Sequence, residues 1–415
     1  MKILLIHQYY LEDNEHGGSR WNEMTRIWAE AGHDITVVAG MVHANGSEKR
    51  PEYKGKYFAR KKQGAVNVIR THVSESYNKN FIGRLWGYFS FMFSAMWAGV
   101  FQIGKGFDCL VVTSPPLFVG LSGYVVSRFK GIPLVFEIRD LWPESAIDTG
   151  VLTNKAIIKL AYAFENFIYR KARLINVLTP AFRDVLLSQK KVPAEKIIFI
   201  PNAADFSLSE QLMREFDARG FREQLGWSND FVVTYVGAHG VANGLEQVVD
   251  TAALLRDTSV RFVLIGAGMQ KEKVRTYAIE KGCTNVEFLD PVPKKDVFKY
   301  ILASDMGASV LIKNDTFKTV YSNKTFDYMA CKKPILMAID GVSRDLVEEA
   351  NAGCFVEPEN PVDFSEKVLY YLHNTKRVVE QGENGYEYAN RKFHRVHLAK
   401  EYIQALDKML TFKKH

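Results

Sequence analysis

Cysteine is scarce in this sequence, and no metal-type spacing accompanies it. The 415 residues contain four cysteines, and none of them belongs to a CxxC pair. This excludes a disulfide-rich secreted scaffold and fits the reducing conditions of a cytoplasm. We therefore expect no disulfide framework and no bound metal ion.

Low-complexity tracts are also missing, as is a leader-type segment at the start. The composition, 47% hydrophobic and 24% charged, is typical of a globular protein. The first residues, 1–6, run directly into an apolar strand pattern, so we expect no signal peptide. A chain of 415 residues is too long for one typical core, and two domains of roughly 200 residues each are expected.

One stretch of the chain lacks charge altogether. No charged residue lies between Arg84 and Lys105, and the segment from Leu85 to Phe101 is rich in aromatic residues. A membrane-spanning helix needs about 18–20 such residues, but glycine and serine dilute this run. Three interpretations stay open: a buried crossover helix, a helix partly exposed to a membrane interface, and a true membrane span.

The net charge of +7 is unevenly distributed. Residues 1–200 contain 26 Lys and Arg against 17 Asp and Glu, whereas the remainder contains 28 against 30. A basic half indicates an anionic partner, such as a lipid surface or a phosphorylated substrate. Nucleic acid is a poor candidate, because the aromatic signatures of RNA-binding domains are missing.

Strand and helix patterns alternate along both halves of the chain. The first half has expected strands at 2–6, 34–39, 66–71, 109–113, 133–138, 174–178 and 197–202. The second half has them at 231–236, 261–265, 286–289, 306–311 and 334–339. Such alternation predicts an α/β fold with two Rossmann-like domains and a ligand cleft between them. The expected domains are residues 1–203 and 204–390, followed by a helix within 391–415 that packs back on the first domain.

Two segments of the first half carry candidate binding residues. A glycine pair, Gly17-Gly18, precedes Ser19 and a predicted helix, where the backbone could approach a ligand or merely reverse direction. Farther on, the segment 137–144 follows a strand and contains Glu137, Arg139, Asp140 and Glu144 among apolar residues. These ionisable residues could form a binding loop or a local network of salt bridges. Residues 45–65 are polar and basic, and we expect an exposed excursion there.

The stretch from Ser322 to Ala330 is the most informative part of the second half. It lies between two buried-strand patterns, and its helix should begin at Ser322 or Asn323, both good N-cap residues. The free N–H groups of a helix N-terminus suit a phosphate, and Lys324 adds a positive charge there. Asp327, one turn on, could accept hydrogen bonds from ribose hydroxyls. An ordinary capped helix with a solvated Asp327 is the alternative.

Taken together, these segments make the chain resemble the GT-B glycosyltransferases, in particular the retaining family 4. The resemblance covers nearly the whole chain and is carried by a series of short motifs. They are the loop 17–19, the segment 139–144 (Arg-Asp-Leu-Trp-Pro-Glu), the segment 200–205, Tyr235 to Gly237, Val263 to Gly268, Ser322 to Lys324 and Asp327 to Ala330. The branch it resembles adds fucosamine or other amino sugars to lipid-linked surface polysaccharides.

The resemblance implies transfer of a sugar from a nucleotide diphosphate to a hydroxyl group, with retained anomeric configuration. The donor-binding residues it implies are Gly17, Gly18, Ser19, Gly237, Gly266, Ser322, Asn323, Lys324 and Asp327. It also implies that Arg139 and Asp140 face the sugar or the acceptor as catalytic residues. UDP is the donor nucleotide that members of the family usually use. The fold generally needs neither a metal ion nor a cofactor. The acceptor would be a glycan or a polyprenyl-diphosphate-linked sugar at the cytoplasmic face of a membrane, where the protein would bind peripherally.

The sequence departs from the family pattern at three positions. The first of two usual glutamates falls at Thr319, and the usual Arg and Lys fall near Ala238 and Asn243. The donor diphosphate then needs other cations, and Lys324, Lys313 and Arg20 are the candidates. Two other functions stay open: a non-catalytic partner subunit that binds nucleotide sugars, and a nucleotide-sugar epimerase on the same fold.

Overall fold

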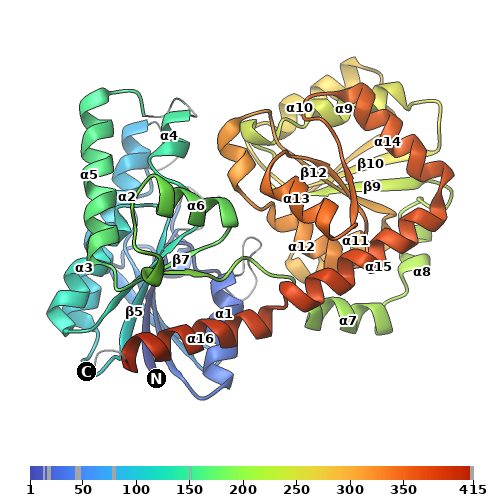
Figure 1. The fold of residues 1–415 in the computed structure, drawn as a ribbon. Coiled ribbons are helices and arrows are strands. Elements are labelled where there is room, and N and C mark those ends of the chain that lie inside the picture. The colour runs from blue at the N-terminus through green and yellow to red at the C-terminus, as the bar shows by residue number, and fades with distance from the viewer. Residues whose placement is uncertain are drawn as a thin grey trace. The chain divides into compact units, whose positions relative to one another are not determined.

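The computed structural model describes residues 1–12, 15, 20–42, 48–76, 81–148, 150 and 152–411. The chain divides into two compact units. One consists of Met1–Pro201 together with Val396–His415, and the other of Asn202–Arg395. Each unit is an α/β domain with its own sheet, as predicted (Figure 1). The predicted ligand cleft between them stays a prediction.

The first unit contains a sheet in which eight described strands follow the order β3-β4-β2-β1-β5-β6-β7-β8. The strands are β1 (Lys2–Ile6), β2 (Asp34–Gly40), β3 (Phe58–Gln63), β4 (Val66–Thr71), β5 (Cys109–Ser114), β6 (Leu134–Ile138), β7 (Leu174–Val177) and β8 (Ile197–Phe199). All neighbouring pairs are parallel except β3 and β4. The central strands are mostly apolar and almost entirely buried because helices cover both faces.

The helices of this unit lie against the faces of that sheet. They are α1 (Arg20–Glu30), α2 (Phe81–Trp97), α3 (Val119–Lys130), α4 (Glu144–Asp148), α5 (Lys155–Lys171), α6 (Pro180–Ser188) and α16 (Arg395–Thr411). Single helical turns occur at Pro51–Tyr53 and Ala194–Lys196, and α2 continues into a π-helical segment, Ala98–Gln102. No helix of the described residues is long and apolar enough to cross a membrane, so the spanning interpretation of residues 85–101 is wrong for this structure.

The prediction of an exposed excursion at residues 45–65 is wrong in part. Residues 58–63 form the edge strand β3, and Tyr53 is buried with its hydroxyl donating to Glu12 at 2.7 Å. The side chains of β3 are mostly exposed and polar, so they give no period-two pattern. The strand is held by its antiparallel pairing with β4, which the sequence pattern does not reveal.

The second unit contains a parallel sheet in the order β11-β10-β9-β12-β13-β14. Its strands are β9 (Phe231–Val236), β10 (Val260–Ile265), β11 (Val286–Leu289), β12 (Met306–Val310), β13 (Ile335–Ala338) and β14 (Gly353–Phe355). Its helices are α7 (Phe206–Glu215), α8 (Ala218–Gln224), α9 (Glu246–Leu254), α10 (Lys271–Glu280), α11 (Lys294–Ala303), α12 (Asn323–Ala330), α13 (Val342–Glu349), α14 (Pro361–His373) and α15 (Thr375–Lys392). Short helical turns lie at Val241–Asn243 and Asp315–Thr319.

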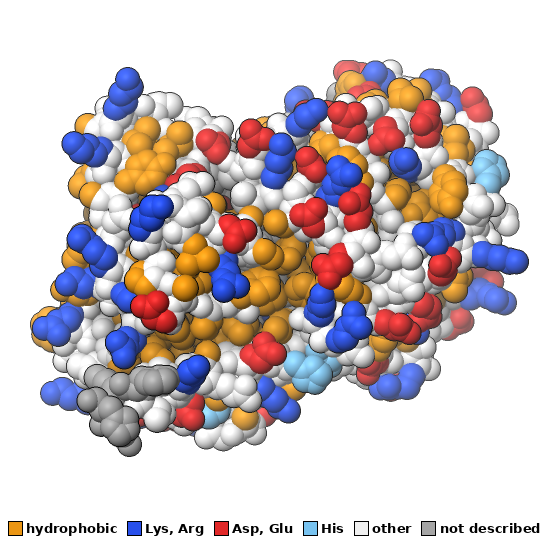
Figure 2. All heavy atoms as spheres, viewed as in Figure 1, with side chains coloured by type: hydrophobic (Ala, Val, Ile, Leu, Met, Phe, Trp, Pro, Cys, Tyr) orange, Lys and Arg blue, Asp and Glu red, His pale blue; other side chains and the backbone are white. Residues whose placement is uncertain are grey.

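The surfaces of the two units differ in the visible view. Figure 2 shows hydrophobic side chains gathered over α4 and α5 of the first unit, with Lys and Arg along its outer edge. Ile157 and Leu160 of α5 are exposed hydrophobic residues. Charged side chains of both signs are mixed on the second unit, in agreement with its nearly balanced composition.

The last helix, α16, packs on α1 within the first unit. Trp21, Trp28 and Tyr402 form a buried cluster in which each pair of rings meets edge to face at 5.4–5.9 Å. The indole N–H of Trp28 donates to the carbonyl of Ala399 at 2.9 Å. Residues more than 370 positions apart therefore share one core, and we infer that this aromatic cluster holds α16 in place.

The aromatic cluster gives a test of this packing. Replacing buried Trp28 by alanine should lower the free energy of unfolding of the first unit by about 3–5 kcal/mol, because an aromatic core residue is lost. Urea titration followed by circular dichroism measures the change. Phe129→Ala, at an exposed residue of the same unit, is the control and should shift stability by no more than about 0.5 kcal/mol. Equal effects of both variants would contradict the packing account.

Candidate functional site

The carboxyl edge of the second sheet brings together most of the predicted donor-binding residues. The strand order changes direction between β9 and β12, so the loops that follow these strands diverge and leave an opening. Gly237 directly follows β9, and Gly266 directly follows β10. Ser322 and α12 follow β12 after a longer loop. This is the edge position at which doubly wound sheets bind ligands.

The two glycine loops at this edge lie against each other. Three backbone hydrogen bonds join them: Gly237 N to Ile265 O at 3.0 Å, His239 N to Ala267 O at 2.9 Å, and Gln270 N to His239 O at 2.9 Å. A Cβ atom on Gly266 would lie only 1.8 Å from the carbonyl oxygen of Gly237. Gly266 is thus required for the contact between the loops.

The helix α12 begins at Asn323, as predicted, but its N-terminus is built differently from the prediction. Ser322 has the extended N-cap conformation and makes no side-chain capping hydrogen bond. Its hydroxyl instead accepts a hydrogen bond from Ser309 of β12 at 2.6 Å. Its backbone N–H donates to the hydroxyl of Ser343 at 3.1 Å. Because the serine side chain is turned away, it does not cover the first-turn N–H groups, which suits the binding of an anion there.

Lys324 lies at the junction of α12 and the first glycine loop. Its ammonium nitrogen lies 4.8 Å from the centroid of the Tyr235 ring and 3.4 Å from the hydroxyl oxygen of Ser322. Its Cε atom lies 3.2 Å from where a Cβ of Gly237 would be. Burial lowers the pKa of Lys324 to about 8, with the charge of Asp327 opposing the shift. A cation held in a poorly solvated position is favourably placed to neutralise a phosphate.

Asp327 and Asn323 lie on the same short helix. Asp327 is partly buried, and its charge acts on the ammonium group of Lys324. Asn323 is exposed, and its side-chain oxygen accepts a hydrogen bond from the Asn202 amide. The structure therefore brings Ser322, Lys324 and Gly237 together, with Asp327 within electrostatic range of the lysine.

His239 was not predicted from the sequence, although it lies inside the first glycine loop. Its side chain is fully buried between Tyr235 and Phe288, and neither ring nitrogen has a hydrogen-bond partner among the described residues. Burial, assisted by the charge of Lys271, lowers the pKa of His239 to about 4, so the imidazole is neutral at pH 7. The position of His239 between Gly237 and Gly240 was the sequence feature that could have identified it as a candidate site residue.

Two charged residues of the first unit, Glu137 and Arg20, are buried together. Glu137 forms a buried, two-pronged ion pair with Arg20, at 3.1 and 3.0 Å. Arg20 also donates to the carbonyls of Ile200 and Pro201. The expectation that Arg20 neutralises a diphosphate is therefore wrong, because its guanidinium group is consumed by this network. Gly17, Gly18 and Ser19 lie outside the described residues.

The segment that follows β6 contains the predicted catalytic pair. The hydroxyl of Ser145 donates to the carboxylate of Asp140 at 2.7 Å, and burial raises the pKa of Asp140. Arg139 lies close enough to buried His7 to lower the pKa of that histidine, after the larger effect of burial. Glu144 instead pairs with Lys190. The interpretation of a local network of salt bridges is therefore wrong for Glu137 and Glu144, because each pairs with a residue outside the segment.

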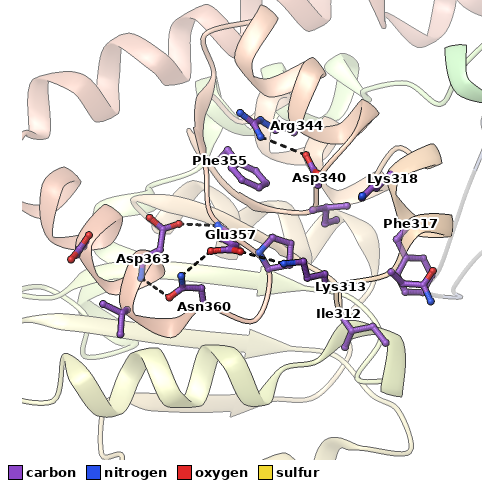
Figure 3. Close-up of a pocket in the computed structure, with 15 residues that line it drawn as sticks. Ile312, Lys313, Phe317, Lys318, Asp340, Arg344, Phe355, Glu357, Asn360 and Asp363 are labelled. Atoms are coloured by element: carbon purple, nitrogen blue, oxygen red, sulfur yellow. Dashed lines mark hydrogen bonds and ion pairs between the residues drawn. The ribbon is translucent and has the colours of Figure 1, made fainter.

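A cavity of about 660 Å³ lies farther along the same edge of the second sheet, after β12, β13 and β14 (Figure 3). Lys313, a predicted phosphate-binding candidate, lines it and forms an ion pair with Glu357 at 3.3 Å. The other predicted residues are not among its described lining residues.

Comparison with known proteins identifies the family. Residues 17–203 match the family described as a glycosyl transferase 4-like domain, and residues 230–374 match the glycosyl transferases group 1. The chain belongs to the family 4 glycosyltransferases. It is therefore an enzyme of the glycosyltransferase class.

Curated relatives agree with this assignment. One is WcaI of Escherichia coli (strain K12), a glycosyl transferase named for colanic acid biosynthesis, 24% identical over 80% of this chain and 81% of that protein. Another is the alpha-D-kanosaminyltransferase of Streptomyces kanamyceticus, 29% identical over 63% of this chain and 67% of that protein.

Solved structures confirm the fold. Anabaena HepE in complex with UDP and glucose superposes with a TM-score of 0.71 at 18% identity, covering 98% of this chain and all of that one. The lipopolysaccharide glycosyltransferase WaaG has a TM-score of 0.69 at 16% identity, with 98% and 99% covered. At these identities the likeness shows the GT-B fold alone.

The buried charge of Lys324 predicts a specific dependence of stability on pH. The pKa of this lysine is lowered in the folded state, so the unfolded chain binds more protons between pH 8 and about 10.4. Lys324→Met, which removes the buried charge, should therefore stabilise the second unit by about 1–2 kcal/mol at pH 7. The gain should shrink as the pH rises from 8 to about 10.

Thermal unfolding at several pH values measures this difference. Lys332→Met, at a partly exposed lysine paired with Glu383, is the control and should show no such gain. A loss of stability in Lys324→Met at pH 7 would contradict this account, in which the charge of Lys324 destabilises the fold and is retained for ligand binding.

Proposed function

We propose that this glycosyltransferase moves an N-acetylated amino sugar from a UDP-sugar to a glycan or polyprenyl-diphosphate-linked acceptor in surface-polysaccharide biosynthesis. The observation that carries the donor site is the position of Lys324, which is next to Gly237 and at the N-terminus of α12. Structures of Anabaena HepE in complex with UDP and glucose and with UDP-glucose support the choice of nucleotide. The curated relatives named for colanic acid and kanosamine support the substrate class.

The chemistry requires charge stabilisation at two places. The bond between the anomeric carbon and the diphosphate breaks, a bond to the acceptor oxygen forms on the same face, and the hydroxyl proton leaves. Negative charge grows on the leaving diphosphate, and we assign its stabilisation to Lys324 and the first N–H groups of α12. Asp327 is assigned to the ribose hydroxyls. With this protein-supplied positive charge, we propose a reaction without a metal ion or cofactor.

We assign the acceptor side to Arg139 and Asp140, which follow β6 in the first unit. Because burial raises the pKa of Asp140, this carboxylate is a better proton acceptor than an ordinary surface aspartate. The leaving phosphate is the other candidate acceptor for the hydroxyl proton. From the resemblance to the family we also propose a role in diphosphate binding for Gly17, Gly18 and Ser19, which lie outside the described residues.

The roles assigned to α12 can be tested by binding measurements. Asp327→Asn should weaken UDP and uridine to a similar extent, since both ligands carry the ribose. Lys324→Met should weaken UDP by about tenfold or more and leave uridine nearly unchanged, because a charge-assisted hydrogen bond is worth about 1.5–3 kcal/mol. Calorimetric titration gives, for UDP and for uridine, the ratio of the dissociation constant of each variant to that of the wild type. Equal losses for UDP and uridine in Lys324→Met would refute the phosphate role.

We also propose that the first unit binds an anionic membrane at the cytoplasmic face. The helix α2 and the following π-helical segment expose Trp86, Phe93, Trp97 and Phe101, each between 47% and 68% accessible. Phe58 of β3 lies beside Trp97, with 6.2 Å between ring centroids. Residues 53–107 contain nine Lys and Arg against one acidic residue, Glu75. Aromatic side chains next to dense positive charge suit the interface of an anionic bilayer.

This membrane proposal predicts salt-sensitive binding to vesicles. The protein should sediment with phosphatidylserine-containing vesicles at low salt and be released as salt rises, since each Lys or Arg contributes about 1 kcal/mol near such a surface. The double variant Trp97→Ser/Phe101→Ser should bind several-fold more weakly, whereas Tyr370→Ser, at an exposed aromatic of the second unit, should not. Absence of binding at low salt would refute the proposal.

A further inference from the structure

The cavity at the ends of β12, β13 and β14 is built by the three segments that follow these strands, including the first turns of α13 and α14. Ile312 to Lys318 follow β12, Ile339 to Arg344 follow β13, and Glu357 to Glu366 follow β14. Its volume of about 660 Å³ lies within the range of small-molecule sites, about 300–1,000 Å³. It is displaced by one or more strands from the loops of Gly237 and Gly266, on the opposite side of β12.

The three cations that line this cavity are each paired with a carboxylate. Lys313 pairs with Glu357 at 3.3 Å, and Lys318 pairs with Asp315 at 2.8 Å. Arg344 bonds to Glu348 at 2.8 Å and lies 3.6 Å from Asp340. Each cation that lines the cavity therefore has a carboxylate partner. A strongly charged ligand would have to break one of these pairs, so the lining favours a neutral ligand.

The same side chains offer a dense set of hydrogen-bonding groups. Glu357 accepts from the Asn360 amide at 3.0 Å, and Asp363 accepts from the Glu357 backbone N–H at 2.8 Å. Figure 3 shows the Phe355 ring between Arg344 and Glu357, with Asp340 beside Arg344 and Lys313 beside Glu357, and all five residues line the cavity. Carboxylates with spare lone pairs next to cations with spare N–H groups suit a ligand whose hydroxyls both donate and accept.

An apolar surface completes the lining. The guanidinium group of Arg344 is stacked over Phe355, 4.2 Å from the ring centroid, which fixes both side chains. Phe317, Ile339 and Val362 add apolar area to the walls. Apolar platforms combined with a few planar polar groups match a sugar ring, which has C–H faces and a rim of hydroxyl groups.

We propose that this cavity binds a neutral saccharide unit, with Asp340, Arg344 and Glu357 hydrogen-bonding its hydroxyls and Phe355 supporting its ring. This proposal rests on the proposed function of sugar transfer. The residues that line the cavity are, however, different from those of the diphosphate site. The saccharide could be the transferable sugar of the donor or a sugar unit of a glycan acceptor. The chemistry of recognition is the same for both.

Saturation-transfer NMR with the full chain tests the proposal directly. The probes are UDP, UDP-glucose, UDP-N-acetylglucosamine and the free methyl glycosides of glucose, N-acetylglucosamine and L-fucose. The test variant is Asp340→Asn/Glu357→Gln, which changes two carboxylates to amides of the same shape. The control is Asp345→Asn, which removes a charge from the exposed side of α13 without lining the cavity. Melting temperature and UDP affinity should be equal in all three proteins, which verifies folding.

We expect the double variant to weaken saccharide binding by about tenfold, and the control to leave it unchanged. If the variant loses only the extra affinity of a UDP-sugar over UDP, the bound unit is the donor sugar. If the variant loses only the signal of the free glycosides, and UDP does not displace these glycosides from the wild type, the bound unit belongs to the acceptor. Identical sugar signals in variant and wild type, or none in either, would overturn the proposal. Failure of UDP to bind the wild type would instead count against the proposed function.

Discussion

The poorly solvated ammonium group of Lys324 is the central constraint on the candidate donor site of the second unit. It is kept in a poorly solvated position by the ring of Tyr235, the hydroxyl of Ser322 and the backbone at Gly237. Such a position costs free energy, which shows in the lowered pKa of the lysine. The close contact of the two glycine loops and the turned-away Ser322 side chain leave room beside this charge. The protein thus maintains a cation whose best partner is an anion from outside the chain.

The first unit depends on a different buried charge, the ion pair between Arg20 and Glu137. Asn176 donates to the same carboxylate at 2.9 Å and accepts from the N–H of Ile200 at 2.8 Å. One network therefore holds together helix α1, strands β6 and β7, and the segment at Ile200 and Pro201. Breaking such a fully buried pair would leave an uncompensated charge, so its role is to fix geometry. Asp140 and Arg139 follow directly from the strand that contains Glu137.

Much of the fold could be predicted from the sequence, because buried parallel strands give continuous apolar runs. Gly237 and Gly266 were found for the same reason, since each stands just after such a run. Lys324 was found from the helix-start pattern at Ser322 and Asn323. Helix α15 was missed, because Gly382 and Gly385 lower helix propensity. The structure explains both glycines: a Cβ on Gly382 would lie 2.1 Å from the carbonyl of Lys332, and one on Gly385 would lie 3.0 Å from Ala352. The role of Arg20 could not be predicted, since its partner is 117 residues away.

The central claim is that Lys324 meets the diphosphate of the donor. The most direct measurement is the pKa of the Lys324 amine, followed by NMR with selectively labelled lysine, with and without UDP. The free protein should titrate near pH 8, and UDP should raise the pKa by more than one unit, because a diphosphate stabilises the charged form. Uridine, which lacks phosphates, should leave the pKa unchanged. A pKa that UDP and uridine leave at the same value would contradict the account.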